Sequence, residues 1–406
     1  MKKYARATRT RTDCSALQPK LQLPKSVFAA LIPEIQQALA MEGYVTPTPI
    51  QEQCIPHLLK GRDMLGNAQT GTGKTAAFAL PLLQRLSNNY RRLQKGTPRA
   101  LILAPTRELA SQIGESIQAY GRFLHLSHTV IFGGVNQSRQ VKALNLGVDI
   151  VVATPGRLLD LMQQEFVHLS EVEVFILDEM DRMLDMGFIP DIKRVLSQIP
   201  AKRQTLFFSA TIAPKMVKLA NTMVRNPVRI EIAPDRPAVE RIVQKVVFVE
   251  KKKKDDLLIS LLDDPKINKA LIFTQMKHTA NRVVKKLCAK GIHGTAIHGN
   301  KSQSLRTKAL NGFKRGSFRV LVATDVAARG LDVDDITHVI NYDLPVEANT
   351  YVHRIGRTAR AGANGDAISF CCTEDRCHLR EIECLLGRPF PSERTTPPII
   401  AMRTPD

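Results

Sequence analysis

The chain has 406 residues, of which 44% are hydrophobic and 24% charged, as in a globular protein with two or three domains of roughly 150 residues. No apolar run approaches the roughly 20 residues of a transmembrane helix, which excludes a membrane-spanning protein. Residues 1–22 lack the apolar core of a secretory signal. The 7 cysteines are too few for a disulfide scaffold, so we expect the chain in the reducing cytoplasm.

The formal net charge is +20, from 58 Lys and Arg against 38 Asp and Glu. Residues 1–23 hold six basic residues and one acidic residue, so +15 of the charge lies in the rest of the chain. Such a surface attracts polyanions. Nucleic acid is favoured over an anionic membrane because no long basic amphipathic stretch with a strong apolar face is present.

Short apolar runs alternate with helical patterns along most of the chain, which predicts an α/β fold with doubly wound parallel sheets. Residues 233–241 carry two prolines and few large apolar residues, which predicts a linker between domains at 24–232 and 242–390. We expect a disordered basic arm at 1–23 and a flexible tail at 391–406. The expected strands are 100–104, 149–153, 173–177, 204–208, 246–249, 270–273, 319–323, 339–341 and 367–371, and the expected helices include 107–120 and 155–164.

A phosphate-binding loop is predicted just before a helix, in the sequence Ala68-Gln69-Thr70-Gly71-Thr72-Gly73-Lys74-Thr75. The two glycines let backbone N–H groups converge on phosphate oxygens, and the helix N-terminus adds positive charge. Lys74 is expected to reach the β- and γ-phosphates of ATP, and Thr75 to bind Mg²⁺. Ala68 stands where the strict pattern has glycine, and the alternative interpretation is an ordinary glycine-rich turn.

A pair of carboxylates, Asp178-Glu179, follows the apolar strand expected at 173–177. Asp178 fits a Mg²⁺ contact, partly through water, and Glu179 fits a base that orients or deprotonates the attacking water. Such a pair is also common as a helix N-cap. The upstream phosphate-binding loop favours the catalytic interpretation.

Further motifs follow in order from about residue 28 to about 384, and with them the chain resembles the DEAD-box ATP-dependent RNA helicases. That family has two RecA-like domains. The motifs are Thr46-Pro47-Thr48-Pro49-Ile50-Gln51, Pro105-Thr106-Arg107-Glu108-Leu109, Gly133-Gly134, Thr154-Pro155-Gly156-Arg157, Ser209-Ala210-Thr211, residues 323–332 and residues 353–360.

The resemblance implies an RNA-dependent ATPase that binds the RNA backbone without sequence specificity and unwinds short duplexes locally. It implies that Gln51 reads adenine, that Asp332 contacts the nucleotide, and that Arg357 and Arg360 act as arginine fingers. Both arginines would share one face if their segment is helical. The alternative is that Arg357 and Arg360 only form salt bridges at the protein surface. The RNA contacts implied are Arg107, Gly134, Thr154, Arg157, Gln303, Arg306, Thr324 and Arg329, and the coupling residues implied are Asp181, Ser209, Thr211 and His353.

Three departures from the family pattern bear on these roles. Met180 replaces the alanine of the name motif, which bears on packing against residues 209–211 and on coupling. Phe28 lies 15 residues before Gly43, where the family has 17, so stacking on adenine and a place in the core remain equal alternatives. Ala359 replaces a usual glycine, a change that we expect to be tolerated if the backbone there is helical.

Two other groups of residues have competing interpretations. The run at 251–254 is four lysines, which favours a solvated face over a phosphate contact. The group Cys371, Cys372, Cys377, His378 and Cys384 lacks paired metal-ligand spacing, so buried cysteine is favoured over a zinc site.

The sequence therefore predicts a monomeric cytoplasmic helicase with ATP and Mg²⁺ as cofactors and RNA as its partner, without a membrane. Ribosome-assembly or RNA-decay proteins are further candidate partners. The rival hypothesis is an ATP-gated RNA clamp that hydrolyses too slowly to remodel RNA. A duplex-DNA translocase is a third hypothesis.

Overall fold

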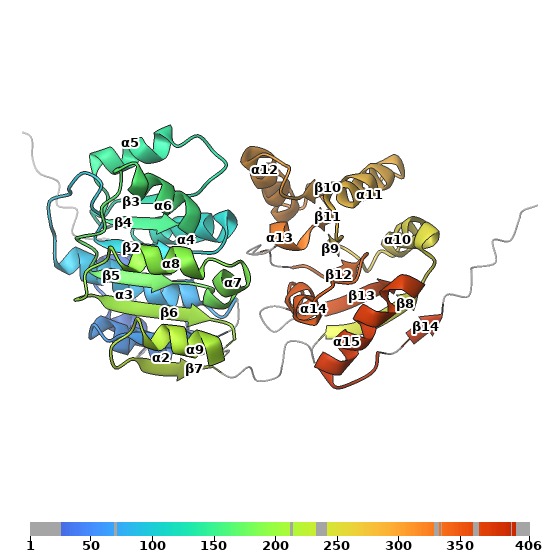
Figure 1. Cartoon of the computed structure of the whole chain (residues 1–406), viewed down its shortest axis with the longest axis horizontal. Helices are drawn as coiled ribbons and strands as arrows, with labels where there is room; N and C mark the ends of the chain where they lie inside the picture. The colour runs from blue at the N-terminus through green and yellow to red at the C-terminus, as the bar shows by residue number, and fades with distance from the viewer. Residues whose placement is uncertain are drawn as a thin grey trace, which may run out of the picture.

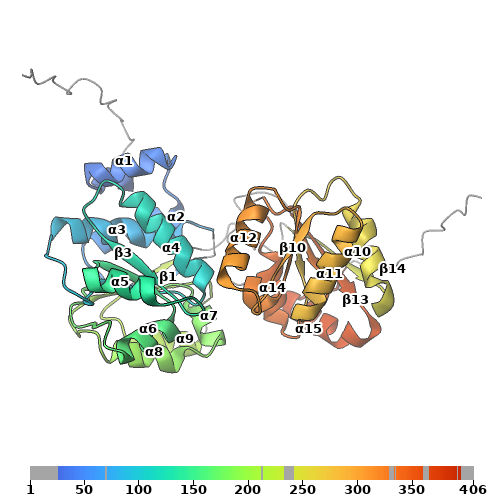
Figure 2. The same cartoon turned by 90° about the horizontal axis from the view of Figure 1, so that it is seen from above.

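The computed structural model describes residues 26–68, 71–211, 214–232, 242–328, 333, 335–359, 365–390 and 392–394. They form two α/β lobes that lie side by side, one in blue to green and the other in yellow to red (Figures 1 and 2). The expected fold class is confirmed: each lobe is built on a parallel sheet covered by helices on both faces. The arm at 1–23 and the linker at 233–241 lie outside the described residues.

The first sheet has the order β3-β4-β2-β5-β6-β1-β7, and every described pairing in it is parallel. Its strands are β1 (Met64–Asn67), β2 (Ala100–Leu103), β3 (His128–Ile131), β4 (Ile150–Ala153), β5 (Val174–Leu177), β6 (Gln204–Ser209) and β7 (Val228–Glu231). Its helices are η1 (Val27–Ala30), α1 (Pro33–Met41), α2 (Pro49–Leu59), α3 (Lys74–Asn88), α4 (Arg107–Tyr120), α5 (Ser138–Leu146), α6 (Pro155–Gln163), α7 (Met180–Asp185), α8 (Ile189–Leu196) and α9 (Pro214–Asn221).

The second sheet repeats the pattern with the order β10-β11-β9-β12-β13-β8-β14, again parallel in the described pairings. Its strands are β8 (Ile242–Phe248), β9 (Ala270–Phe273), β10 (Gly294–Ile297), β11 (Val320–Ala323), β12 (His338–Asn341), β13 (Gly365–Cys371) and β14 (Ser392–Arg394). Its helices are η3 (Lys251–Lys253), α10 (Lys254–Leu262), α11 (Lys277–Ala289), α12 (Gln303–Lys314), α13 (Asp325–Ala328), α14 (Ala348–Ile355), η4 (Thr373–Asp375) and α15 (Arg376–Leu386).

Central strands such as β2, β4 and β5 are buried along their whole length, which explains their unbroken apolar sequences. Alternate side chains of β2 enter different cores. Ile102 packs with α3 and α4 on one face, whereas Leu101 and Leu103 pack with α6 and α8 on the other. Because the strands are parallel, their carboxyl ends and the loops that follow them meet at one edge.

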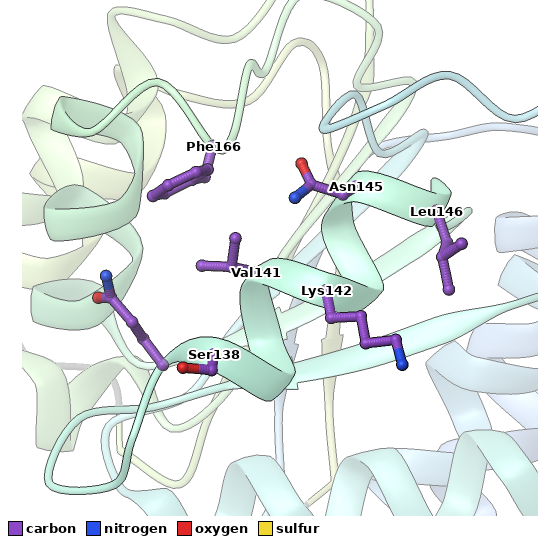
Figure 3. Close-up of a pocket in the computed structure, with 7 residues that line it drawn as sticks. Ser138, Val141, Lys142, Asn145, Leu146 and Phe166 are labelled. Carbon is purple, nitrogen blue, oxygen red and sulfur yellow. The ribbon is translucent and has the colours of Figure 1, made fainter.

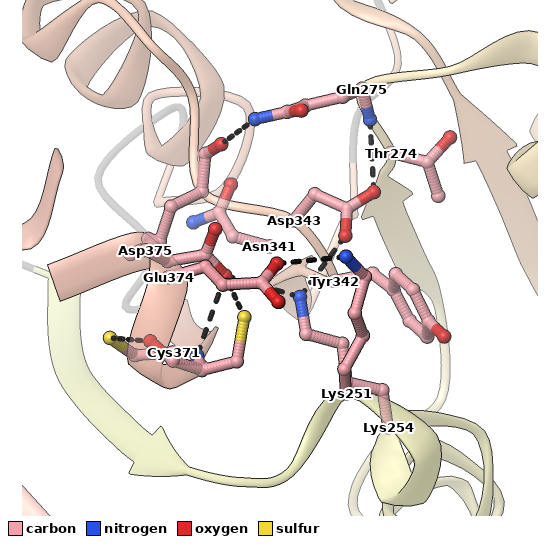
Figure 4. Close-up of polar contacts among 12 residues, drawn as sticks. Lys251, Lys254, Thr274, Gln275, Asn341, Tyr342, Asp343, Cys371, Glu374 and Asp375 are labelled. Atoms are coloured by element: carbon pink, nitrogen blue, oxygen red, sulfur yellow. Dashed lines mark hydrogen bonds and ion pairs between the residues drawn. The ribbon is translucent and has the colours of Figure 1, made fainter.

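Two sequence interpretations in the second lobe are corrected. The flexible tail expected from residue 391 is wrong for Ser392–Arg394, which pair with β8 as strand β14. The solvated face expected at 251–254 is wrong for Lys254. Its side chain is buried, and its Nζ lies 3.1 Å from an Asp343 carboxylate oxygen and 3.3 Å from one of Asp375 (Figure 4). A buried ammonium needs such partners.

The two neighbouring cysteines, Cys371 and Cys372, are buried at the end of β13. The Sγ of Cys372 donates a hydrogen bond to an Asp375 carboxylate oxygen at 2.8 Å. Their burial agrees with the interpretation as core cysteines, but that interpretation is wrong for Cys377 and Cys384, which are exposed. No helix within the described ranges combines the length and the apolar character required to cross a bilayer.

Candidate functional site

The predicted phosphate-binding loop lies between β1 and α3, at the carboxyl edge of the first sheet. Gly71 and Gly73 have φ of 83° and 92°, a left-handed region that glycine adopts without strain. Lys74 opens α3 and is 6% exposed, and its Nζ has no hydrogen-bond partner in the described structure. A buried ammonium without a partner leaves a strong donor for an anion in this loop. Thr75 is half-buried one residue further along α3.

Gln51 touches this loop directly. It is 1% exposed at the start of α2, where its Oε1 accepts a hydrogen bond from the backbone N of Thr48 at 3.0 Å. Its Nε2 donates to the carbonyl oxygen of Gly73 at 3.2 Å. A Cβ on Gly73 would lie 2.5 Å from this Nε2, so the close packing requires glycine at that position. The expected adenine-reading residue is thus joined to the phosphate-binding loop.

Phe28 is a core residue. The sequence had left open whether it stacks on adenine or lies in the core. It is fully buried in η1, and its ring meets that of Tyr44 edge-on with centroids 6.2 Å apart. Ser26 caps this short helix by accepting a hydrogen bond from the backbone N of Phe28 at 3.1 Å. In this arrangement the ring has no face exposed to a nucleotide.

Two buried carboxylates follow β5. Asp178 and Glu179 are 2% and 4% exposed, and Asp178 Oδ1 accepts a hydrogen bond from the backbone N of Glu179 at 2.9 Å. Glu179 has a φ of 53°, and its side chain makes no capping hydrogen bond to α7. The N-cap alternative is therefore not supported. Instead, Glu179 Oε2 accepts from Arg182 Nη1 at 2.5 Å, a buried ion pair that the sequence interpretation missed. The sequence did contain a signal for this ion pair, because Glu179 and Arg182 are three residues apart, a spacing that brings side chains together on a helix.

Asp181 joins α7 to the end of β6. Its Oδ2 accepts hydrogen bonds from the backbone N of Ala210 and of Thr211, each at 3.1 Å, and from Thr211 Oγ1 at 3.2 Å. Ser209 Oγ completes the turn by donating to the Thr211 carbonyl oxygen at 2.8 Å. Met180 is fully buried in the core formed with α6, α8 and α9. Asp181, rather than Met180, therefore makes the polar link to residues 209–211.

In the second lobe, Arg354 fixes helix α14. It is 2% exposed, and its guanidinium donates to both carboxylate oxygens of Asp325, at 2.5 and 2.7 Å. It also donates to Asn341 Oδ1 at 3.1 Å and to the Asp343 carbonyl oxygen at 2.6 Å. Such a buried fork holds α14 against α13 in one orientation. The sequence analysis did not single out Arg354.

Arg357 lies beyond the end of α14, in the boundary between the lobes. It is 6% exposed, its Nε donates to the His353 carbonyl oxygen at 3.3 Å, and it lines a small pocket with Arg182 of the first lobe. Helix α14 ends at Ile355 and residues 356–359 are not helical, so the condition under which Arg357 would share a helical face with Arg360 is not met up to residue 359. Burial, reinforced by the charge of Arg182, lowers the pKa of His353.

Ala359 corrects a further expectation. Its φ is 55°, so the backbone is left-handed rather than helical. In this conformation the Cβ of an L-residue crowds the following carbonyl, which costs about 1–2 kcal/mol. The usual glycine of the resembling family would not carry this strain.

We expect Ala359→Gly to raise the free energy of unfolding by about 1 kcal/mol, because removing the strain outweighs the about 0.4–1 kcal/mol that glycine costs through the unfolded chain. Urea unfolding would measure it. The matched control is Ala119→Gly inside α4, which should lower stability by about 1 kcal/mol. A loss of stability in both variants would contradict the assignment of strain to position 359.

The predicted RNA contacts of the first lobe gather on the same carboxyl edge. Arg107 opens α4 after β2, Thr154 precedes α6 after β4, and Gly134 follows β3. Gly134 has a φ of 74°, and a side chain there would clash with the Arg107 guanidinium. Arg157 Nη1 donates to the Val135 carbonyl oxygen at 3.4 Å.

The contacts predicted in the second lobe meet this group through Glu108. Its Oε1 accepts from Arg306 Nη2 at 2.7 Å and from Gln303 Nε2 at 3.3 Å, both on α12. Arg107 Nη1 donates to Gln303 Oε1 at 3.5 Å. Residues from both lobes are thus brought into one polar cluster, whose central carboxylate the sequence analysis did not single out. Thr324 follows β11. The candidate residues Gln69, Thr70, Arg329, Asp332 and Arg360 lie outside the described residues.

Comparison with known proteins shows the family to which a chain with this arrangement of residues belongs. The family model for the DEAD/DEAH box helicase matches residues 48–219, and that for the helicase conserved C-terminal domain matches residues 253–362. The ATP-dependent RNA helicase RhlB of Pseudomonas syringae is 43% identical over 378 residues, which cover 92% of this chain and 95% of that protein. This chain belongs to the DEAD-box helicase family.

Solved structures of other DEAD-box helicases share the two-lobed fold. S. cerevisiae Dbp5 bound to RNA and ADP BeF3 has a TM-score of 0.77 and 34% identity, covering 92% of this chain and 96% of that one. The DEAD-box helicase Mss116 bound to single-stranded RNA and UDP-BeF has a TM-score of 0.80 and 30% identity, covering 90% of this chain and 78% of that one.

Proposed function

We propose that this DEAD-box helicase hydrolyses Mg–ATP at the carboxyl edge of its first sheet and uses the reaction to unwind or remodel short RNA duplexes. The observation that carries the proposal is the unpartnered Lys74 ammonium, buried in a glycine cradle beside Asp178. Its charge acts on Asp178 by lowering the pKa of that carboxyl, against the stronger effect of burial. A triphosphate supplies the anion that this donor needs.

The residues present fit the nucleotide and its metal. The loop 68–75 and Lys74 would hold the phosphates, Gln51 would read adenine, and Thr75 and Asp178 would hold Mg²⁺. When bound, Mg²⁺ neutralises charge on the phosphate oxygens. Glu179, held by Arg182, would accept the proton of the attacking water. Arg357 would stabilise charge on the transferred phosphoryl group, and we assign Arg360 and Asp332 to the same site by their motifs.

RNA would bind across both lobes, to Arg107, Gly134, Thr154 and Arg157 of the first lobe and to Gln303, Arg306, Thr324 and Arg329 of the second. Cationic and backbone groups contact phosphates without reading bases, so binding would tolerate sequence and weaken with salt. Asp181, Ser209, Thr211 and His353 would couple the two sites, since the Asp181 network ties the carboxylate helix α7 to β6. RNA is therefore the partner that we propose.

Affinity for Mg–ATP is expected to depend on the protonation of Asp178. Burial raises the pKa of this carboxyl to about 6, with the Lys74 ammonium opposing the shift. Below that pH the carboxyl is protonated and cannot bind Mg²⁺. We expect the KM for Mg–ATP to be level between about pH 7 and 8 and to rise about tenfold per pH unit below about pH 6.

Steady-state ATP hydrolysis from about pH 5 to 8 measures this dependence. The control is Asp178→Asn, which leaves the protonation of the nucleotide itself unchanged. An inflection of the same size in that variant would assign the titration to another group.

The proposed function itself is tested by ATP hydrolysis with and without single-stranded RNA, followed by strand separation of a short duplex. Strong stimulation by RNA together with ATP-dependent unwinding is the expected result. Tight ATP-dependent RNA binding without turnover would favour the RNA clamp instead. Competition by DNA of the same sequence distinguishes an RNA helicase from a DNA translocase. A protein that contacts 2′-hydroxyls prefers RNA, so DNA should compete poorly.

We also propose that the protein is a cytoplasmic monomer, for which ribosome-assembly or RNA-decay proteins are candidate partners. Support comes from the cysteines, which are all unpaired among the described residues, as a reducing compartment requires. Light scattering on the purified protein would test the monomer. A mass of two or more chains at micromolar concentration would contradict it.

A further inference from the structure

A groove of about 420 Å³ runs beside α5 on the first lobe, outside the residues proposed for ATP and RNA. Its walls are α5 on one side and the loop that carries Phe166 on the other (Figure 3). Its volume lies within the about 300–1,000 Å³ range of small-ligand sites. The lining residues are Gln137, Ser138, Val141, Lys142, Asn145, Leu146 and Phe166.

One end of the groove is close in the chain to the proposed RNA site. Gln137 at its entrance lies three residues after Gly134 and two after Val135, whose carbonyl oxygen holds Arg157. Helix α5 starts at the carboxyl edge of the sheet, after β3, and returns to the opposite edge before β4. An RNA strand that left the Gly134 contact and followed α5 would therefore reach the groove.

The groove carries the groups that hold an unpaired nucleotide. Phe166 is half-buried and lies across the groove from Val141 on α5 (Figure 3), so a base could stack on its ring. Asn145 is exposed, and its amide offers both a donor and an acceptor to a base edge. At the entrance, Gln137 Nε2 donates to Gln164 Oε1 at 2.8 Å, which joins the two walls.

The charge of this face also suits RNA. Helix α5 contains Arg139 and Lys142, both exposed, and no acidic residue. The nearby carboxylate of Asp160 is engaged by Arg157 Nε at 3.2 Å and by Gln164 Nε2 at 2.8 Å. The exposed Glu165 is the acid that remains next to Phe166. The two cations of α5 outnumber it.

We propose that the groove between α5 and Phe166 extends the RNA site and takes an unpaired nucleotide of the strand that leaves Gly134 and Arg157. The proposal rests on the proposed RNA function. A single-stranded backbone follows the cations, one base stacks on Phe166, and Asn145 contacts its edge. This subsite adds affinity for longer RNA without selecting a sequence.

The test measures the Kd of oligouridylates for the full chain in the presence of a non-hydrolysable ATP analogue. The RNA starts from the shortest that binds and is lengthened one nucleotide at a time, at the 5′ end in one series and at the 3′ end in the other. In one series we expect the Kd to fall about tenfold at a single added nucleotide, as for one base stacked on an aromatic ring.

Phe166→Ala and, separately, Asn145→Ala should remove or reduce this step and leave the Kd of the shortest RNA unchanged. The matched control is Phe123→Ala, which changes an exposed aromatic residue of the first lobe outside the groove and should retain the step. Lys142→Gln should lower the salt dependence of the longer RNA only, whereas Lys202→Gln at an exposed loop should not.

The outcomes separate this inference from the proposed function. If the shortest RNA binds but neither series shows a step, or if the step persists in Phe166→Ala, the groove is not an RNA subsite. If no RNA of any length binds with the ATP analogue, the proposed RNA function fails, and the subsite fails with it.

Discussion

Replacing Glu179 with glutamine is expected to lower the kcat of RNA-stimulated ATP hydrolysis by about 10²–10⁴-fold, the usual contribution of a positioned general base. The carboxylate is 4% exposed and held by Arg182 at 2.5 Å, so its position is fixed before any water arrives. Glutamine keeps the shape and the hydrogen bonding of one oxygen but cannot accept the proton at neutral pH.

Binding should survive this change, because the phosphates and RNA are held by other groups. Steady-state turnover, beside the Kd for a fluorescent ATP analogue and for single-stranded RNA, measures both effects. The control is Glu115→Gln, the same carboxylate-to-amide replacement at an exposed position of α4 that has no assigned role. A Glu179→Gln variant that keeps at least a tenth of wild-type turnover would show that another group accepts the proton.

The second large effect is expected from Arg357→Lys, which should lower kcat by about 10³-fold, the lower end of the range for an arginine finger. Lysine keeps the charge but lacks the planar guanidinium fork, whose geometry suits contact with two phosphoryl oxygens at once. Arg357 lies at the lobe boundary with Arg182 of the first lobe, so its contribution depends on the lobes being together.

Single-turnover hydrolysis with saturating RNA isolates this step from binding. Thermal unfolding should show little change, because the stabilising fork of this segment belongs to Arg354 and Asp325. Arg380→Lys, at an exposed position of α15, is the matched control. If the loss of kcat is accompanied by an equal loss of RNA affinity, Arg357 acts in closure or RNA binding rather than on the phosphoryl group.

Much of the fold followed from local sequence. The apolar runs of β2, β5 and β9 lie within one residue of their predicted positions, since strands buried on both faces must be apolar throughout. The phosphate-binding loop at 68–75 could also be predicted from local sequence. Its two glycines have the left-handed backbone that the motif requires, and Lys74 is buried at the start of α3.

Other features depended on contacts between residues far apart in the chain. Nothing local indicated that Glu108 would meet Arg306, 198 residues away, or that Lys254 would leave its lysine run to pair with Asp343 and Asp375. These buried charges are stabilised by partners on other helices and loops, which only the tertiary structure brings together.

The sequence by itself determined the two parallel-sheet lobes, the phosphate-binding loop and the carboxylates after β5, because each depends on residues adjacent in the chain. The tertiary structure alone decided that Phe28 is core, that Ala359 is left-handed and that Asp181 links α7 to residues 209–211. These outcomes depend on how separate segments pack, and packing brings together residues whose spacing in the sequence carries no signal.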